Sequence, residues 1–395
     1  MSEANAGRMG LLLAGVLIAS AVRIAPGVGS AVHAQEPAPV EPDAPVPPGF
    51  MAHTPERLAA QGSERDAGGS AVSIATGECP GPITEDLTLT ADLACSLDVL
   101  GSGITIDLGG HTLTGRIAGG SMTIRNGTVD GAGVRPFAGV IFAGSGSLIE
   151  GVEVRNGASW TMILPGANST VRNSRFINNR SVVFDLWWGS RHTIENNLFV
   201  GNGIAVSNQL GNDHKIQRNF FVDNATGVGF WNEDHWGVSN NVVRNNVFLN
   251  NQVGVSLVAT EGRRHPDLGA MDNNEFRDNV FFGNTLSGMR MRLLTCGRFF
   301  PLVGECPAQG TRIEGNVLAF NGSEALEPDD DDGLHVTPDP NWAGFFTLKH
   351  NKALFNADLG IEADGVIDGG RNLGLLNRDP RQCVGVRCAP GRPWR

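Results

Sequence analysis

The sequence predicts an all-β solenoid, a single-stranded parallel β-helix of about ten to eleven coils, from three observations. Apolar anchors recur every 22 or 23 residues in the middle of the chain. After most anchors an Asn stands three residues and again eight residues later, as Asn197 and Asn202 do after Ile194. The chain also has 53 Gly together with many Asn, a composition that suits many tight corners and argues against a helical enzyme. The most regular anchors are Ile149, Val171, Ile194 and Ile216.

The recurring Asn can serve a solenoid in two ways. Asn tolerates the left-handed backbone conformation that a sharp corner requires. Its amide can also hydrogen-bond to the equivalent Asn one coil away, as in stacked Asn ladders. A leucine-rich repeat has a similar period and also uses an Asn. Its Leu spacing is absent here, and Val, Ile and Phe fill the apolar positions instead. We therefore favour the β-helix.

The order of segments predicts an exported protein. Residues 1–34 are predicted to be a secretory signal peptide cut after Ala34, because Arg8 precedes an uncharged apolar run. An uncleaved membrane anchor is the alternative. Residues 35–75 are predicted to form a Pro-rich linker and a peripheral segment, 76–378 the β-helix, and 379–395 a C-terminal tail with a local disulfide. No other apolar run is long enough to span a membrane, so we expect a secreted or cell-surface protein without stable membrane insertion after cleavage.

Inserted loops are expected in the C-terminal half. Beyond Val243 the anchors stand 33 to 37 residues apart, whereas a plain coil needs about 22 to 25. The extra residues fall at 259–271, 293–310 and 325–332. Loops on a regular scaffold often carry function.

The six cysteines form three close pairs in the sequence. In an exported chain an even number of cysteines indicates disulfides. Local pairing is the simplest arrangement, although sequence alone does not fix the connectivity. The CxxC spacing of cysteine metal sites is absent, so the cysteines are not expected to bind zinc. The pairs are Cys79 with Cys95, Cys296 with Cys306, and Cys383 with Cys388.

The charge of the chain bears on its partners. The formal net charge is −11, so the basic surface that nucleic-acid binding requires is missing. An anionic ligand would therefore have to meet a local cluster of Arg rather than the field of the whole protein.

Outward-facing residues of the strands that follow each second Asn predict a site. Strand alternation places two columns of side chains outside the solenoid. The first column is predicted as Val183, Ala205, Gly229, Ser256, Arg290, His335 and Glu362, and the second as Asp185, Ser207, Trp231, Val258, Arg292, Thr337 and Asp364. Polar groups of both signs thus gather on the last coils.

The late members of these columns are candidate catalytic residues: Arg290, Arg292, His335, Glu362 and Asp364. Arg can neutralise the carboxylate of an acidic sugar, and His335 can act as a base near neutral pH. Glu362 and Asp364 would then orient His335 or bind calcium. The spacing of Glu362 and Asp364 also suits an inverting glycosidase. The non-functional alternative is a solvent-exposed face on which residues of opposite charge pair with one another.

Three further groups are candidate ligand or metal residues. Asp329, Asp330, Asp331 and Asp332 offer oxygen ligands that suit calcium, with a solvated acidic loop as the alternative. His192, His214, His235 and His265 stand in turns, where a His ladder bonded to the backbone is preferred to a divalent metal site that uses Asp213, His214, Asp234 and His235. Aromatic side chains can stack on sugar rings, and the candidate substrate-binding residues are Asp185, Trp187, Trp231, Trp236 and Trp342.

Two segments carry a family resemblance. Residues 79–115, with Cys79-Pro80-Gly81 at their start and a Gly-Gly-His-Thr-Leu-Thr-Gly close at 109–115, resemble the opening of secreted bacterial right-handed parallel β-helix repeat proteins. Residues 379–388 resemble their ending. The family usually has Asn where Gly109 stands. The fold is shared by pectate lyases, polygalacturonases and alginate epimerases, but also by tailspikes and adhesins, and fold does not imply function.

The resemblance implies a right-handed solenoid that binds a polysaccharide or other glycan along one face. The leading hypothesis is a secreted protein that binds an acidic polysaccharide and cleaves or epimerises it, as a lyase, an epimerase or a glycoside hydrolase. The alternative is a non-catalytic surface adhesin or scaffold. An enzyme should bring its Arg, His and carboxylate side chains together, whereas a scaffold should show them spread and mutually paired.

Overall fold

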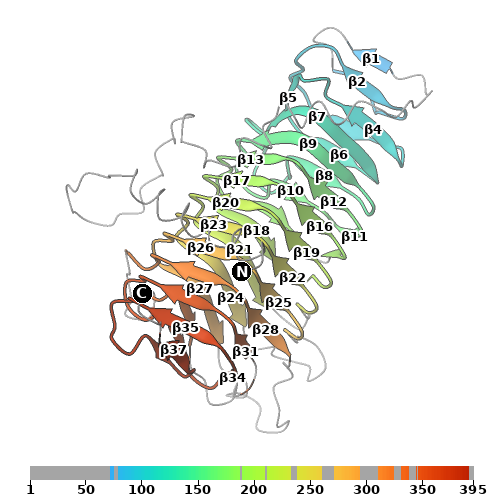
Figure 1. Ribbon diagram of the computed structural model, residues 1–395. Coiled ribbons are helices and arrows are strands. Elements are labelled where there is room, and N and C mark those ends of the chain that lie inside the picture. The colour runs from blue at the N-terminus through green and yellow to red at the C-terminus, as the bar shows by residue number, and fades with distance from the viewer. Residues whose placement is uncertain are drawn as a thin grey trace, which may run out of the picture. The chain divides into compact units, whose positions relative to one another are not determined.

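The structure is a computed structural model, and it describes residues 72–74, 79–186, 189–209, 211–232, 238–259, 271–293, 310–323, 331–337, 344 and 346–390. All of these lie in one compact unit, Glu64–Arg395. Every regular element in the described residues is a β-strand, and the strands stack in chain order along a solenoid (Figure 1). Within the same residues there is no apolar helix long enough to cross a membrane.

Each coil contributes strands to three walls. The first row comprises β1 (Val72–Ile74), β2 (Leu87–Leu89), β4 (Ile104–Asp107), β7 (Met122–Asp130), β9 (Leu148–Arg155), β12 (Thr170–Arg172), β16 (Thr193–Glu195), β19 (Lys215–Gln217), β22 (Val242–Arg244), β25 (Glu275–Arg277), β28 (Thr311–Glu314), β31 (Phe346–Lys349) and β34 (Ile367–Gly370). The second row comprises β5 (Thr112–Thr114), β13 (Arg175–Ile177), β17 (Leu198–Val200), β20 (Phe220–Val222), β23 (Val247–Leu249), β26 (Val280–Phe282), β29 (Val317–Ala319), β32 (Lys352–Leu354), β35 (Asn372–Leu375) and β37 (Cys388–Pro390). The long strands β7 and β9 pair with both rows and so join them.

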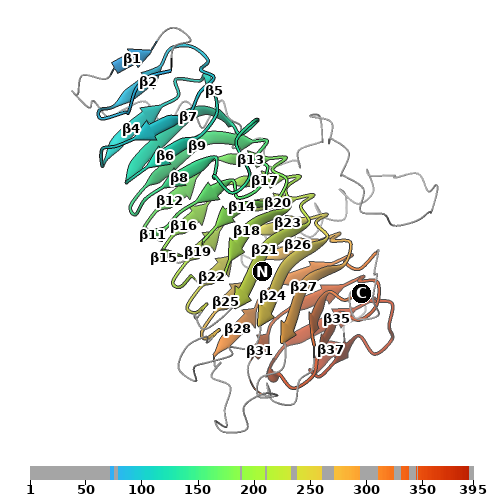
Figure 2. The same cartoon turned by 180° about the vertical axis from the view of Figure 1, so that it is seen from behind.

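The third wall, the site sheet, carries the candidate site. Its strands run in chain order as β3 (Leu97–Val99), β6 (Ile117–Gly119), β8 (Ile141–Ala143), β10 (Met162–Ile163), β14 (Val182–Asp185), β18 (Ile204–Asn208), β21 (Thr226–Asn232), β24 (Val253–Ala259), β27 (Ser287–Leu293), β30 (Leu334–Val336), β33 (Ile361–Ala363) and β36 (Cys383–Val384). A small pair, β11 (Gly166–Ala167) and β15 (Gly189–Ser190), lies between this sheet and the first row. Within the described residues the site sheet has 12 strands, close to the expected ten to eleven coils, and Figure 2 shows the same stack from behind.

One apolar core runs inside the solenoid. The predicted anchors Val171, Ile194 and Ile216 are fully buried. Beside them, equivalent Phe side chains stack from coil to coil with ring centroids 4.7–5.0 Å apart. This stack comprises Phe176, Phe199, Phe221, Phe248 and Phe281. Stacking the coils thus buries apolar surface that no single coil could bury.

The expected Asn ladders are confirmed at two corners. The Oδ1 of Asn219 accepts hydrogen bonds from both the backbone N–H and the Nδ2 of Asn197, while the Nδ2 of Asn219 donates to the carbonyl of Ile194. The first ladder continues through Asn246, Asn279, Asn316, Asn351 and Asn372, and the second runs through Asn179, Asn202, Asn224, Asn251, Asn284, Asn321, Asn356 and Asn377. Every amide is satisfied inside the wall.

The left-handed conformation expected of these Asn residues is wrong by one position. The residue immediately before each ladder Asn has the positive φ, for example 55° at Asn196 and 56° at Arg218. The two neighbouring residues have separate roles. The corner residue adopts the bent backbone conformation and its side chain points outward, whereas the side chain of the ladder residue points into the wall. The corner position therefore tolerates Arg or Asp, whereas the ladder position needs a side chain that accepts a hydrogen bond from the previous coil, as Ser174 also does.

The third corner holds a mixed ladder. The backbone N–H of Ser169 donates to Nδ1 of His192, and the backbone N–H of His192 donates to Nδ1 of His214. Asn241 and Asn274 continue the same pattern. The preferred His ladder is therefore confirmed for His192 and His214, which are fully buried. His235 and His265 lie outside the described residues.

The three predicted cysteine pairs have three outcomes. Cys383 and Cys388 form a disulfide that ties β36 to β37 at the last coil. Cys79 and Cys95 are free thiols, so the disulfide expected there is not formed. The two thiols nevertheless interact, and burial together with Cys79 raises the pKa of Cys95 to about 12. Cys296 and Cys306 lie outside the described residues.

Candidate functional site

The register of the site sheet confirms the charged end of the first predicted column. Arg290 on β27 pairs with His335 on β30, and His335 pairs with Glu362 on β33. On the other side, Gly229 pairs with Ser256 and Ser256 with Arg290. Neighbouring strands lie about 4.8 Å apart, so these residues form one continuous file.

The early part of that column was predicted two residues out of register. Ser207 pairs with Gly229, and Asp185 pairs with Ser207. Asp185 and Ser207 therefore belong to the file of Arg290, while Val183 and Ala205 are fully buried and lie outside it. The error arose because Ile204 faces Thr226, which begins its strand with a polar residue, and apolarity alone aligned Ile204 with Val228.

Trp231 is the one predicted aromatic residue within the described part of the chain. A Cβ atom added to Gly229 would lie 2.1 Å from Cη2 of Trp231, so the indole ring lies directly over Gly229. The ring thereby occupies the file between Ser207 and Ser256, and any side chain at Gly229 would have to displace it. Trp187, Trp236 and Trp342 lie outside the described residues.

The centre of the site is a His held between two carboxyl groups. Nδ1 of His335 lies 3.0 Å from Oδ2 of Asp332 and 3.3 Å from Oε2 of Glu362. The side chains of Asp332 and His335 are almost fully buried, with exposures of 0% and 3%, whereas that of Glu362 is 30% exposed. The backbone N–H of Leu359 donates to Oδ1 of Asp332 at 2.9 Å and fixes the carboxyl group. Glu362 is therefore the member of the group that solvent reaches.

Burial governs the charge of this group. Loss of solvation raises the pKa of Asp332 to about 7, His335 acts to lower it, and Glu362 raises it further. Ionising both carboxyl groups beside one imidazole would place two negative charges close together in a buried site, which is energetically unfavourable. The group thus holds a proton that it can gain or lose near neutral pH.

Asp332 was expected as a calcium ligand and not as the partner of His335. The two residues stand only three positions apart, at the bend that leads into β30, but strand alternation gave no signal that their side chains would meet. Asp331, Asp332 and Asp358 also offer oxygen atoms within 4.8 Å of one another. Asp329 and Asp330 lie outside the described residues, so calcium binding by the four-Asp run stays a prediction.

The remaining catalytic candidates flank the centre. Arg292 pairs with Val258 in the second column and is half-buried, like Arg290 on the same face of β27. Asp364 follows the end of β33 and is exposed. The structure therefore brings Arg290, His335 and Glu362 into one file, adds Asp332, and places Asp364 at the margin.

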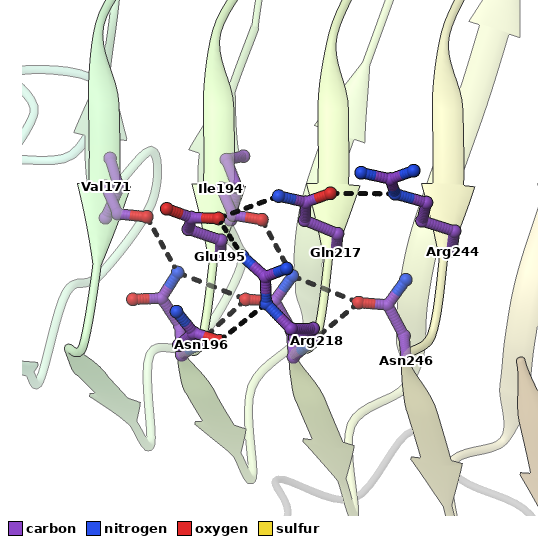
Figure 3. A network of polar contacts seen from close by, with 10 residues as sticks. Val171, Ile194, Glu195, Asn196, Gln217, Arg218, Arg244 and Asn246 are labelled. Atoms are coloured by element: carbon purple, nitrogen blue, oxygen red, sulfur yellow. Dashed lines mark hydrogen bonds and ion pairs between the residues drawn. The ribbon is translucent and has the colours of Figure 1, made fainter.

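Outside the site, charged and polar side chains on the surface pair with one another, as expected of a structural scaffold. On the first row, Gln217 donates to Glu195 and accepts from Arg244, and Arg218 contacts Glu195 from the corner. Figure 3 shows these side chains paired across successive coils, beside the Asn ladder. Mutual pairing of this kind needs no ligand. The buried acid–base group of the site sheet is of a different kind.

Comparison with known proteins supports the fold. A family model described as a right handed beta helix region matches residues 116–281. The protein is thus a right-handed parallel β-helix, as the sequence predicted. No curated protein matches the chain in sequence.

Several solved structures are similar in outline. A hyperthermoactive exopolygalacturonase from Thermotoga maritima shares 16% identity over 81% of this chain and 84% of its own, with a TM-score of 0.40. A mannuronan C-5 epimerase A-module from Azotobacter vinelandii shares 18% over 85% and 93%, with a TM-score of 0.40. Endopolygalacturonase I from Stereum purpureum, complexed with two galacturonate, shares 14% over 82% and 96%, with a TM-score of 0.40. Scores of this size say nothing about activity.

Proposed function

We propose that the protein acts outside the cytoplasm, binds an acidic polysaccharide along the site sheet, and moves a proton at a bound uronate residue. The observation that carries the proposal is the file of Arg290, His335 and Glu362 with Asp332 behind it. Anion recognition and acid–base groups stand on adjacent strands there. The Cys383–Cys388 disulfide supports the location, because disulfides persist in oxidising compartments.

Arg290 and Arg292 are the groups that recognise the acidic sugar. They stand two residues apart on one face of β27, so their Cα atoms are about 7 Å from each other. A guanidinium group can bind a carboxylate through two parallel hydrogen bonds. Because the whole chain carries a net charge of −11, these local positive charges select where on the surface a polyanion binds.

Glu362 is the group that meets the substrate, since its side chain is 30% exposed and that of His335 only 3%. Glu362 takes the proton from C5 of the uronate, and Arg290 stabilises the charge that develops on the adjacent carboxylate. His335, held by Asp332, positions Glu362 and shares the proton. In this mechanism the base is therefore Glu362, and not His335 as the sequence had suggested.

Two products are open to the resulting carbanion. If a proton returns to the opposite face of C5, the residue is epimerised. If the C4–O bond breaks instead, its electron pair leaves with the oxygen, that oxygen gains a proton, and a C4=C5 double bond forms. Both reactions begin with the same broken C5–H bond, so one experiment can detect either.

The test is solvent exchange in D2O with polygalacturonate, alginate and glycosaminoglycans as substrates. Deuterium at C5, measured by mass spectrometry, reports proton removal, and ultraviolet absorbance reports the double bond. Glu362→Gln should lower the rate by about 10²–10⁴-fold. Glu314→Gln is the matched control, because Glu314 lies on the first row and pairs with Lys349.

Two results would count against this function. Reducing ends without deuterium or unsaturation would indicate hydrolysis, with Glu362 and Asp364 as the carboxyl pair. No reaction with any polymer by the folded protein would favour the non-catalytic scaffold. The paired charges of the first row are the observation that keeps that second candidate open.

A further inference from the structure

We propose that Asp332, His335 and Glu362 also form a binding site for a divalent transition-metal ion. The ligand atoms are Oδ2 of Asp332, Nδ1 of His335 and Oε2 of Glu362. The inference goes beyond the proposed function, because an ion can bind here whether or not the protein acts on a polysaccharide.

The distances fit a shared ion. Ligand atoms that surround Zn²⁺ at about 2.0–2.2 Å lie roughly 3.0–3.6 Å from one another. The two separations measured from Nδ1 of His335 are 3.0 and 3.3 Å. All three side chains offer a ligand atom within 4.8 Å of the others. Little rearrangement is therefore needed to complete three positions of a coordination shell.

The ligand set selects the class of metal. A mixed set of one imidazole nitrogen and two carboxylate oxygens suits Zn²⁺ and its transition-metal neighbours, whereas Ca²⁺ and Mg²⁺ prefer oxygen ligands alone. Two ionised carboxylates and a neutral imidazole also balance the two charges of the ion. The expected preference thus differs from the calcium that the Asp329–Asp332 run predicts.

The site is held in place before any ion arrives. The strand register fixes His335 beside Glu362, and the N–H of Leu359 fixes Asp332 through its other oxygen. Such supporting hydrogen bonds orient metal ligands. Burial of Asp332 and His335 keeps bulk water from competing, and the partly exposed Glu362 leaves an entry path.

One consequence links the ion to the proposed function and rests on it. A bound ion withdraws electron density from the Glu362 carboxylate through Oε2 and makes that carboxylate a weaker base for the C5 proton. Zinc should therefore inhibit solvent exchange. Binding itself is measured without polymer, so it can fail or succeed independently of the enzymatic hypothesis.

The experiment is calorimetric titration of the tag-free, metal-stripped protein with ZnCl2. Wild-type protein should bind zinc, and Glu362→Gln and His335→Ala should each weaken that binding by at least about tenfold. Glu314→Gln is the matched control, since Glu314 lies on the first row and pairs with Lys349, and it should leave the affinity within about twofold. A large excess of CaCl2 should not displace zinc.

Two outcomes would overturn the inference. The first is wild-type protein that binds no zinc at about 1 mM. The second is undiminished binding by folded Glu362→Gln, which would place the ion elsewhere. Glu362 is partly exposed, so its substitution should preserve the fold even if that of a buried ligand does not, and thermal unfolding checks this. The absorption spectrum of Co²⁺ bound in place of Zn²⁺ gives a second measurement of affinity, and the same variant should weaken Co²⁺ binding to a similar degree.

Discussion

At the scale of single residues, the buried imidazoles of the third corner make stability sensitive to acid. Nδ1 of His192 accepts a backbone hydrogen bond, so the neutral ring carries its proton on Nε2. Burial lowers the pKa of His192 to about 4 and that of His214 to about 3. Because the unfolded chain binds protons more readily, with a pKa of about 6.5, stability is full above that value and falls as the pH drops toward 4.

The variant His192→Asn tests this directly. Asn241 and Asn274 already occupy equivalent ladder positions, so an amide oxygen can replace Nδ1 there. We expect wild-type protein to lose about 2 kcal/mol more than the variant between pH 7 and pH 4.5, measured by denaturant unfolding. Gln252→Asn, a change at an exposed side chain that does not titrate, should keep the wild-type pH dependence. An equal loss in all three proteins would contradict the assignment.

Residue-level prediction from the sequence succeeded where alternation decides and failed where packing decides. Arg290, His335 and Glu362 were placed correctly because each lies between two buried apolar residues of its strand. The role of Asp332 was missed because burial of a carboxyl group beside a His depends on a neighbouring coil. Its hydrogen bond from Leu359 comes from residues 27 positions away, which no local pattern records.

At the scale of the corner, two adjacent Asn residues have different structural roles. Asn246 is buried in the first ladder, whereas Asn245 is exposed and adopts a φ of 54°. Asn246→Ala leaves several buried backbone and amide groups without partners and should cost about 2–4 kcal/mol. Asn245→Ala loses only tolerance of the left-handed conformation and should cost about 1–2 kcal/mol.

Chemical denaturation of the two single variants measures this contrast. Asn245→Gly serves as the control, since Gly adopts positive φ readily, and it should stay close to wild type. A larger loss for Asn245→Ala than for Asn246→Ala would show that bending, and not the ladder, limits the stability of the corner. The sequence pattern alone had assigned both duties to one residue.

At the scale of the whole solenoid, the period of the repeat was enough to predict the architecture. Each coil contributes equivalent apolar and amide positions. The pattern therefore recurs many times, and a single irregular copy does not obscure the prediction. The site has no such redundancy. Asp185 was misaligned by one irregular strand start at Thr226, and the longest insertions have no repeat to align.

Continuity of the core and ladders predicts that the described coils unfold together. One cluster of buried apolar residues extends from Ile83 to Val386, and the second ladder runs without a break from Asn179 to Gln382. In a solenoid, stability is a sum of coil and neighbour terms, and strong neighbour terms make opening global. Asn246→Ala should therefore speed hydrogen exchange equally in β17 and β32, on either side of the substitution, by about 30-fold for each 2 kcal/mol lost. Faster exchange confined to β20–β26, measured by mass spectrometry, would instead mean that the stack opens locally. In that case a substitution in another coil would not change how often the site on β27–β33 opens, and the stability of those strands alone would set that opening rate.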